Sequence, residues 1–369
     1  MSPSRVFGRR PVLALSVLLI SLSLFSQDTS TPTISREVKV VNVLATVRDK
    51  KGSIVNNLSK DDFRLTQDGR PQIIHYFTRE SDLPLTLGLL VDTSMSQRRL
   101  IDAERTGSYA FLNEFMRVDK DKAFIIHFDW DVELLQDLTG DHQKLQAALD
   151  KLGAPHFDNS GGGSPGGGGG YPRGGGPQHH AGGTTLYDAV FLASDELMPK
   201  QQGRKALILL TDGVDTGSKV SLNRAIETAQ RANTLVYSIL YSDPDAYGHQ
   251  YGPRGGMGGG MGRHGGWPGG GGYPGGGGGY PPQQRQEHPD GKKVLQRMSR
   301  ETGGRFFEVS KKESINQIYD QIADELRNQY NIGYTPEKAV AGVGYHAINL
   351  TTTNKDLSVQ AREGYYAEQ

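Results

Sequence analysis

The sequence predicts an α/β fold in which a doubly wound, mostly parallel sheet is flanked by a small β-sandwich-like module from both chain ends. One observation predicts the sheet. Between residues 83 and 328, short apolar runs alternate with stretches of helical periodicity, and apolar strands joined by helices are typical of a parallel sheet covered on both faces. A second observation, the strand-like alternation in residues 38–80 and 331–366, predicts the module. Each of these segments forms only a marginal sheet alone, so we expect them to pair with each other.

The first residues are typical of a secretory signal peptide. Three arginines precede a mostly apolar run at residues 11–25, and a small residue follows near an expected cleavage point. The alternative is an uncleaved anchor, but the run is short of the about 20 residues that span a membrane. We therefore expect residues 1–27 to be a signal peptide and residues 28–37 a linker. The protein would be bacterial and exported to the periplasm, cell envelope or medium, with no stable membrane span after cleavage.

Strands and helices alternate within residues 83–328. Strands are expected at residues 86–92, 122–129, 132–139 (a short one), 205–213, 234–242 and 305–309. Helices are expected at residues 99–116, 143–152, 184–198, 222–233, 291–304 and 314–330. The first helix should direct Ile101, Ala110, Phe111 and Phe115 toward the core.

Two glycine-rich segments interrupt this pattern. Residues 158–183 contain 13 glycines and residues 248–282 contain 19, so neither buries enough apolar surface to offset its ordering entropy. We expect both to be flexible insertions that emerge near the carboxyl edge of the sheet. They serve as spacers or, alternatively, as self-associating elements through their tyrosine and tryptophan residues. The histidines in or beside them are expected to stay solvated.

Composition excludes several functional classes. Lys plus Arg and Asp plus Glu both number 41, so the zero net charge gives no general attraction to nucleic acid or anionic membranes. Cysteine is absent, which excludes disulfides, thiolate metal sites and cysteine nucleophiles. Lys200, Arg204 and Lys205 are expected to form a solvated basic face, and His127 to be an ordinary strand-end residue.

Oxygen side chains follow three predicted elements. Asp92, Ser94 and Ser96 come straight after one strand, Asp212 follows another, and Thr184 follows two glycines at the start of a helix. Ligands of open α/β sheets bind beyond the carboxyl ends of the strands, and hard oxygen donors suit Mg²⁺ best, with Mn²⁺ or Ca²⁺ as alternatives. Taken singly, each residue also fits a helix N-cap or a turn. Their joint occurrence predicts a divalent metal site.

This motif resembles the metal-ion-dependent adhesion site, or MIDAS, of von Willebrand factor type A (VWFA) domains. The pattern D-x-S-x-S, then threonine after Gly-Gly, then aspartate in T-D-G matches at all five positions. The resemblance implies a Rossmann-like VWFA fold in which Ser94, Ser96 and Thr184 bind the metal directly or nearly so. Asp92 and Asp212 would act mainly through water. Glycine-rich insertions are unusual in such domains.

The flanking segments extend the resemblance. "NNLSKDDFRLTQDGRPQII" on the N-terminal side and "YNIGYTP … VQAREGYYA" on the C-terminal side resemble the exported VWFA-related domain proteins of Acidobacteria.

These observations predict a protein-binding module for adhesion or assembly, not an enzyme. Two carboxylates balance a divalent cation, hydroxyls add no charge, and Mg²⁺ demands about six ligands. An exposed Asp or Glu of a protein partner could therefore complete the coordination.

One alternative is a structural cell-envelope protein whose Gly/Tyr-rich loops self-associate. Another is a Mg-dependent phosphatase-like hydrolase with Asp92 as nucleophile, but Ser94 stands where such an enzyme needs a second aspartate. The chain also lacks G-x-S-x-G, Walker-lysine and H-E-x-x-H motifs.

Overall fold

A computed structural model describes residues 40–79, 83–153, 183–241, 290–336 and 343–367. The predicted signal peptide and linker, the second glycine-rich insertion and the first one up to residue 182 lie outside these ranges. The chain divides into two compact units, residues 1–38 and 39–369, and the described residues all belong to the second. In the described part of the chain, no helix is long and apolar enough to cross a membrane.

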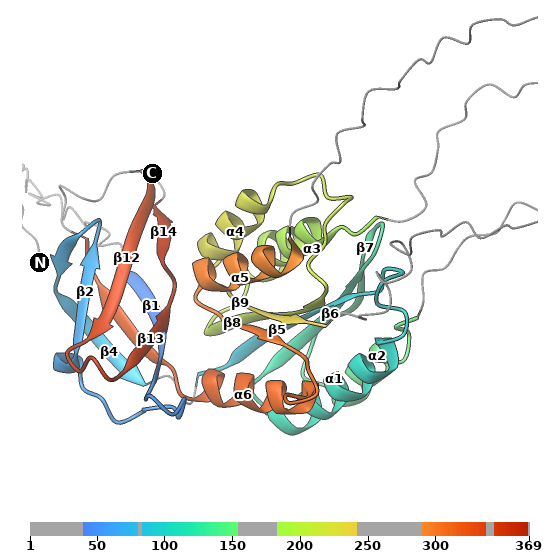
Figure 1. The fold of residues 1–369 in the computed structure, drawn as a ribbon, viewed down its shortest axis with the longest axis horizontal. Coiled ribbons are helices and arrows are strands. Elements are labelled where there is room, and N and C mark those ends of the chain that lie inside the picture. The colour runs from blue at the N-terminus through green and yellow to red at the C-terminus, as the bar shows by residue number, and fades with distance from the viewer. Residues whose placement is uncertain (1–39, 80–82, 154–182, 242–289, 337–342, 368–369) are drawn as a thin grey trace, which may run out of the picture. The chain divides into compact units, whose positions relative to one another are not determined.

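A six-stranded sheet forms the centre of the α/β region (Figure 1). Its strand order is β10-β9-β8-β5-β6-β7, and all neighbours are parallel except the antiparallel pair β6 and β7. The strands are β5 Leu85–Asp92, β6 Lys122–Phe128, β7 Val132–Thr139, β8 Arg204–Thr211, β9 Leu235–Leu240 and β10 Phe306–Glu308. The predicted fold class is therefore confirmed. The strand β7 is not short, because its eight residues pair along β6 as a half-exposed edge.

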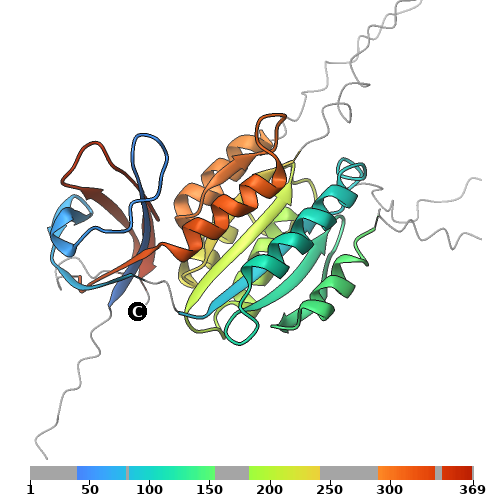
Figure 2. The ribbon, with the colours of Figure 1, turned by 90° about the horizontal axis from the view of Figure 1, so that it is seen from below.

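Helices cover both faces of this sheet, as a doubly wound fold requires (Figures 1 and 2). They are α1 Ile101–Phe115, α2 His142–Leu149, α3 Leu186–Leu192, α4 Leu222–Arg231, α5 Gly291–Thr302 and α6 Ile315–Arg327, with a π-helical turn at Ala193–Leu197 after α3. One apolar core joins the sheet to α1, α2 and α6, and a second joins it to α3, α4 and α5. Ala110 of α1 is only half-buried, contrary to expectation.

The central strand β5 is buried along its whole length, and this burial explains a glycine within it. A Cβ atom at Gly88 would lie 2.3 Å from the Phe124 ring and 2.5 Å from the Leu207 side chain. Only glycine lets these two side chains meet across the strand. The tight packing holds β5 between β6 and β8, and so places the residues at its carboxyl end.

The two ends of the chain build two four-stranded sheets that share one apolar core. Their orders are β13-β1-β11-β4 and β14-β12-β2-β3, so each sheet combines strands from both ends. The strands are β1 Val41–Arg48, β2 Phe63–Gln67, β3 Arg70–Gln72, β4 Ile74–Arg79, β11 Tyr330–Tyr334, β12 Gly344–Thr352, β13 Ser358–Ala361 and β14 Gly364–Ala367. The β-sandwich-like module of the predicted fold class is thus present, whereas the exact domain boundaries stay a prediction.

The expectation of a solvated basic face is wrong for two of its three residues. Lys200 is exposed, but Arg204 and Lys205 are only 4% and 9% exposed. Both lie at the start of β8, where Arg204 donates to the carbonyl oxygens of Leu83 and Leu326. The sequence showed two adjacent cations without revealing that distant segments enclose them.

Candidate metal centre

The first predicted ligand, Asp92, ends the central strand β5 and is fully buried. Its Oδ1 accepts a hydrogen bond from the backbone N–H of Ser94 at 2.9 Å. Its Oδ2 accepts from the hydroxyl of Thr211, the last residue of β8, at 2.6 Å. Because β5 and β8 are parallel neighbours, the sheet itself brings these two strand ends together. The carboxylate is therefore held in one orientation from both sides.

The two serines that follow lie side by side. The hydroxyl oxygens of Ser94 and Ser96 are 3.0 Å apart, as their spacing of two residues in a turn predicts. They do not cap the next helix, because α1 begins only at Ile101 and its N-cap residue, Leu100, makes no side-chain cap bond. The N-cap interpretation of these serines is therefore wrong. The geometry presents two adjacent neutral oxygen donors next to a carboxylate.

Asp212 lies on the loop that leaves β8. Its Oδ1 accepts from the backbone N–H of Val214 at 3.0 Å, as a turn residue would. The next residue, Gly213, has φ +79°, and a Cβ there would lie 2.4 Å from the carbonyl oxygen of Gly291. Asp212 is near enough to Asp92 for its charge to raise the pKa of that carboxyl. The loop geometry thus places a second carboxylate beside the first.

The backbone of Thr184 is hydrogen-bonded to the loop that follows Asp212. Its N–H donates to the hydroxyl of Thr216 at 3.0 Å, and its carbonyl oxygen accepts from the N–H groups of Thr216 and Gly217. These contacts join the segment before α3 to the loop that follows Asp212. The N-cap of α3 is Thr185, not Thr184, so the capping interpretation is wrong here as well. Thr184 itself is 7% exposed.

Electrostatics at this edge of the sheet favour a cation. Burial, and then the charge of Asp212, raises the pKa of Asp92 to about 7, against the lowering effect of its hydrogen bonds. Burial also raises the pKa of Glu104 well above its usual value, and repulsion by Asp92 and Asp212 adds to this effect. Charge repulsion thus acts among three acidic side chains, and no basic group contributes to either pKa. A divalent cation would supply the missing positive charge.

Glu104 and Gln97 are the residues that sequence reasoning missed. Both are completely buried, and in the described part of the chain neither side chain has a hydrogen-bond partner for either polar atom. Orphaned polar atoms are costly to bury, so these two fit a site that holds a charged or hydrated ligand. A signal for Glu104 existed: it shares the helical stripe of Ile101 and Phe111, which faces the core.

The residues present therefore fit a hard divalent cation. Asp92, Ser94, Ser96, Thr184 and Asp212 would hold it, and the cation would supply a Lewis-acidic point that accepts a further oxygen ligand. Within the described ranges, no three His, Cys, Asp or Glu side chains are grouped as a metal site.

Comparisons with known proteins find likeness in structure only. No protein-family model matches the chain, and no curated protein matches its sequence. An aerotolerance-related membrane protein from Bacteroides fragilis, solved with multiple mutations to serines, is 15% identical with a TM-score of 0.40, over 66% of this chain and 98% of that one. The conserved hypothetical protein BatB from Bacteroides thetaiotaomicron is 16% identical with a TM-score of 0.39, over 66% and 97%.

A third similar structure is proximal thread matrix protein 1 from the mussel byssus, which has been solved with a zinc-occupied MIDAS motif. It is 12% identical with a TM-score of 0.42, over 71% of this chain and 50% of that one. Because all of these TM-scores are below 0.5, the function proposed next rests on the residues of this chain.

Proposed function

We propose that the chain is an exported VWFA-type module that binds a divalent cation, most favourably Mg²⁺, and uses it to capture an acidic side chain of a protein partner. The cation would lie among Asp92, Ser94, Ser96, Thr184 and Asp212. The observation that carries the proposal is the excess of buried negative charge at the carboxyl edge of the sheet, where Asp92 and Asp212 repel each other beside paired serine hydroxyls.

Charge balance supports the capture of an acidic ligand. Two carboxylates neutralise a divalent cation, and the three hydroxyls stabilise it without adding charge. Mg²⁺ takes about six oxygen ligands and keeps water where the protein supplies none. A carboxylate from a partner would replace such a water with a charged ligand, and it would form a charge-assisted bond only while the cation is present.

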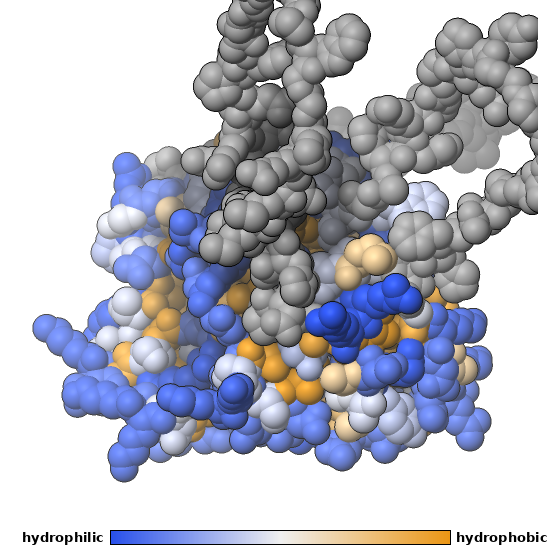
Figure 3. Space-filling model, turned by 45° about the vertical axis from the view of Figure 1, so that its right-hand side comes forward, coloured by the Kyte–Doolittle hydropathy of each residue, from blue (hydrophilic) through white to orange (hydrophobic). Residues whose placement is uncertain are grey.

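Exposed apolar side chains beside the proposed cation would add contact area for a protein partner. Met95 stands between the two serines and is 48% exposed, and Trp130, in the turn between β6 and β7, is 62% exposed. The carbonyl oxygen of Asp129, next to Trp130, accepts from both the N–H and the hydroxyl of Thr185. The turn therefore lies against the segment of Thr184. Figure 3 shows hydrophobic patches within a largely hydrophilic face, and Trp and Met are enriched at protein interfaces.

Capture from the native cell envelope tests this function. Immobilised full-length chain is incubated with a solubilised envelope extract in Mg²⁺ or in EDTA, and retained proteins are identified. We expect retention of a protein in Mg²⁺ only, and its loss with Asp92→Asn. The matched control is Asp320→Asn, which changes an exposed aspartate on α6. Equal retention in EDTA, or by Asp92→Asn, would contradict metal-dependent capture.

The hydrolase alternative has no support in the geometry. Ser94 contacts Ser96 and donates its N–H to Asp92. It offers no proton donor or acceptor equivalent to a second aspartate, so we keep the expectation that the chain is not an enzyme. The self-associating loops of the structural alternative lie outside the described residues.

A further inference from the structure

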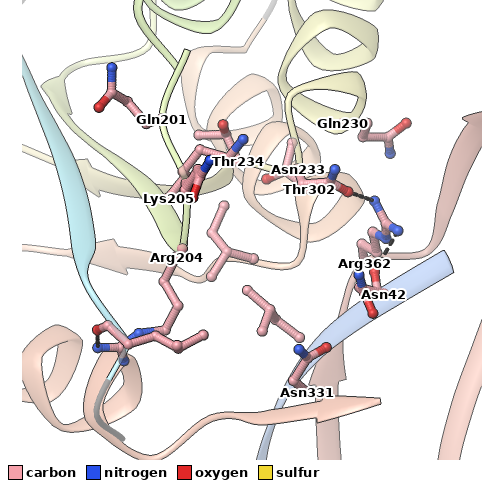
Figure 4. Close-up of a pocket in the computed structure, with 15 residues that line it drawn as sticks. Asn42, Gln201, Arg204, Lys205, Gln230, Asn233, Thr234, Thr302, Asn331 and Arg362 are labelled. Carbon is pink, nitrogen blue, oxygen red and sulfur yellow. Dashed lines mark hydrogen bonds between the residues drawn. The ribbon is translucent and has the colours of Figure 1, made fainter. Parts of the chain in front are cut away.

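A second polar cavity lies at the opposite edge of the six-stranded sheet, where β8 and β9 begin (Figure 4). Its volume is about 330 Å³, which is enough for a small metabolite. One wall comes from the starts of β8 and β9 and the end of α5, and the other from β1, β11 and the residue that follows β13. Segments from both chain ends and from the α/β region thus meet around it.

The lining of this cavity carries positive charge without negative charge. Arg204, Lys205 and Arg362 line it, and none of the described lining residues is Asp or Glu. Most of the other lining residues carry neutral amide or hydroxyl groups, among them Asn42, Gln230 and Asn233. In a chain of zero net charge, this is a local excess of cations.

Lys205 is the cation of the three whose charged group has the fewest polar partners. It is 9% exposed, and burial alone lowers the pKa of its ammonium, with no carboxylate opposing the effect. In the described part of the chain, the ammonium has no ion pair or hydrogen bond. Buried lysines normally have a partner. Even the exposed Lys292 has a partner, since its ammonium lies 2.5 Å from the carboxylate of Glu308.

Arg362 is similarly buried among neutral partners. It is 8% exposed, and it donates from Nη1 to Asn233 Oδ1 at 2.9 Å and from Nη2 to the carbonyl oxygen of Asn42 at 2.6 Å (Figure 4). Its Nε has no partner in the described part of the chain. Burial lowers the pKa of this guanidinium to about 10, and Tyr334 and Tyr365 oppose this effect only in part.

A neutral acceptor completes the set of unsatisfied groups. Gln230 donates from Nε2 to the carbonyl oxygen of Glu301 at 2.6 Å, but its buried Oε1 accepts no hydrogen bond among the described residues. Three side chains that line the cavity, Lys205, Arg362 and Gln230, therefore each have a polar atom without a partner in the described part of the chain. A ligand that satisfies all three carries an anionic oxygen group and a separate hydroxyl or N–H donor.

We propose that this cavity binds a small hydroxylated anion, such as a sugar acid or a sugar phosphate. Lys205 and Arg362 would pair with its carboxylate or phosphate, and Gln230 would accept from a hydroxyl. The ligand would supply the negative charge that these cations lack. In an enclosed site an unpaired charge destabilises the fold strongly, and a charge-assisted hydrogen bond is strong. Because both chain ends contribute to the lining, bound ligand would also stabilise the contact between the β-sandwich and the α/β region.

Three ligands of similar size separate the possible chemistries. Glucuronate carries a carboxylate, glucose 6-phosphate carries a phosphate, and glucose is the neutral analogue. Binding to the full chain is measured by calorimetry and by the shift in Tm, with ionic strength held constant by chloride. We expect at least one of the two anions to bind and to raise the Tm. Glucose should bind at least about tenfold more weakly, because it lacks the charge-assisted bonds.

Lys205→Met tests the role of the unpaired ammonium. We expect this variant to lose at least about tenfold in anion affinity and, without anion, to have a higher Tm than the wild type, because a buried unpaired charge is removed. The control is Lys122→Met, which changes an exposed lysine at the start of β6, two strands away from β8 in the same sheet. It should leave anion binding unchanged. Arg362→Lys, which keeps the charge but loses the paired geometry, should weaken binding as well.

Three results would overturn the proposal. The first is no heat and no Tm shift with either anion up to about 10 mM, a weak-binding limit. The second is equal binding of glucose and the anions. The third is anion binding that Lys205→Met leaves unchanged. We expect Lys205→Met to raise the Tm while it lowers the anion affinity. A variant that fails to fold would lower both, so the two measurements distinguish lost binding from lost folding.

Discussion

Replacing Asp92 by asparagine should stabilise the metal-free protein at alkaline pH. The pKa of Asp92 rises from its ordinary 3.8 to about 7 in the folded chain. Each tenfold change in proton affinity corresponds to about 1.4 kcal/mol, so ionised Asp92 costs the folded state about 4 kcal/mol relative to the unfolded state. The cost is absent below pH 3.8, grows as the pH rises and is fully present above pH 7, because between these values the folded state binds the extra proton.

Urea denaturation in EDTA at pH 5 and pH 8 measures this effect. The free energy of unfolding of the wild type should be lower at pH 8, and Asp92→Asn should exceed the wild type there by about 2–4 kcal/mol, allowing for one imperfect amide hydrogen bond. At pH 5 the difference should shrink, because Asp92 is then mostly protonated. Saturating Mg²⁺ should stabilise only the wild type.

Asp320→Asn serves as the control, since it removes an exposed aspartate without changing the site. If Asp92→Asn is less stable than the wild type by the same amount at both pH values in EDTA, Asp92 is not a strained buried carboxylate, and the charge argument fails.

Three further substitutions test other parts of the structure. Glu104→Gln should stabilise the EDTA-treated protein at pH 8 and weaken Mg²⁺ binding by about tenfold, measured by denaturation and calorimetry; unchanged Mg²⁺ affinity would show that this buried carboxyl acts only in packing. Gly88→Ala should lower the free energy of unfolding by about 1–3 kcal/mol through its clash with Phe124, and Phe124→Leu added to it should recover part of the loss; additive losses would contradict the clash. Glu325→Gln should lower the free energy of unfolding by about 3–5 kcal/mol, because Glu325 is buried in an ion pair with Arg48. A decrease no larger than that caused by Glu308→Gln, at an exposed position, would contradict this.

The sheet could be predicted from local pattern alone. The strands β5 and β8 each contain an apolar run, and such runs alternating with helices are typical of the buried middle of a covered parallel sheet. The edge strand β7 spans the expected residues 132–139, although its residues are only partly buried or exposed and so give a weaker apolar signal. Pairing between the chain ends followed from the marginal stability of each half alone.

The candidate centre could be predicted in part. The spacing of Ser94 and Ser96 predicted their paired hydroxyls, since residues two apart in a turn point the same way. Helical periodicity places Glu104 on the core face, but a lone charged residue in an apolar stripe does not by itself predict a site residue. The burial of Lys205 depends on segments more than a hundred residues away, and no local pattern records it.

Calorimetric titration of Mg²⁺ into the EDTA-treated and dialysed full chain measures occupancy of the proposed cation site. We expect saturable binding of one cation per chain, with Mn²⁺ or Ca²⁺ competing for the same site, and loss of that binding in Asp92→Asn and in Ser94→Ala combined with Ser96→Ala. A folded wild-type chain that takes up none of the three cations would contradict this expectation.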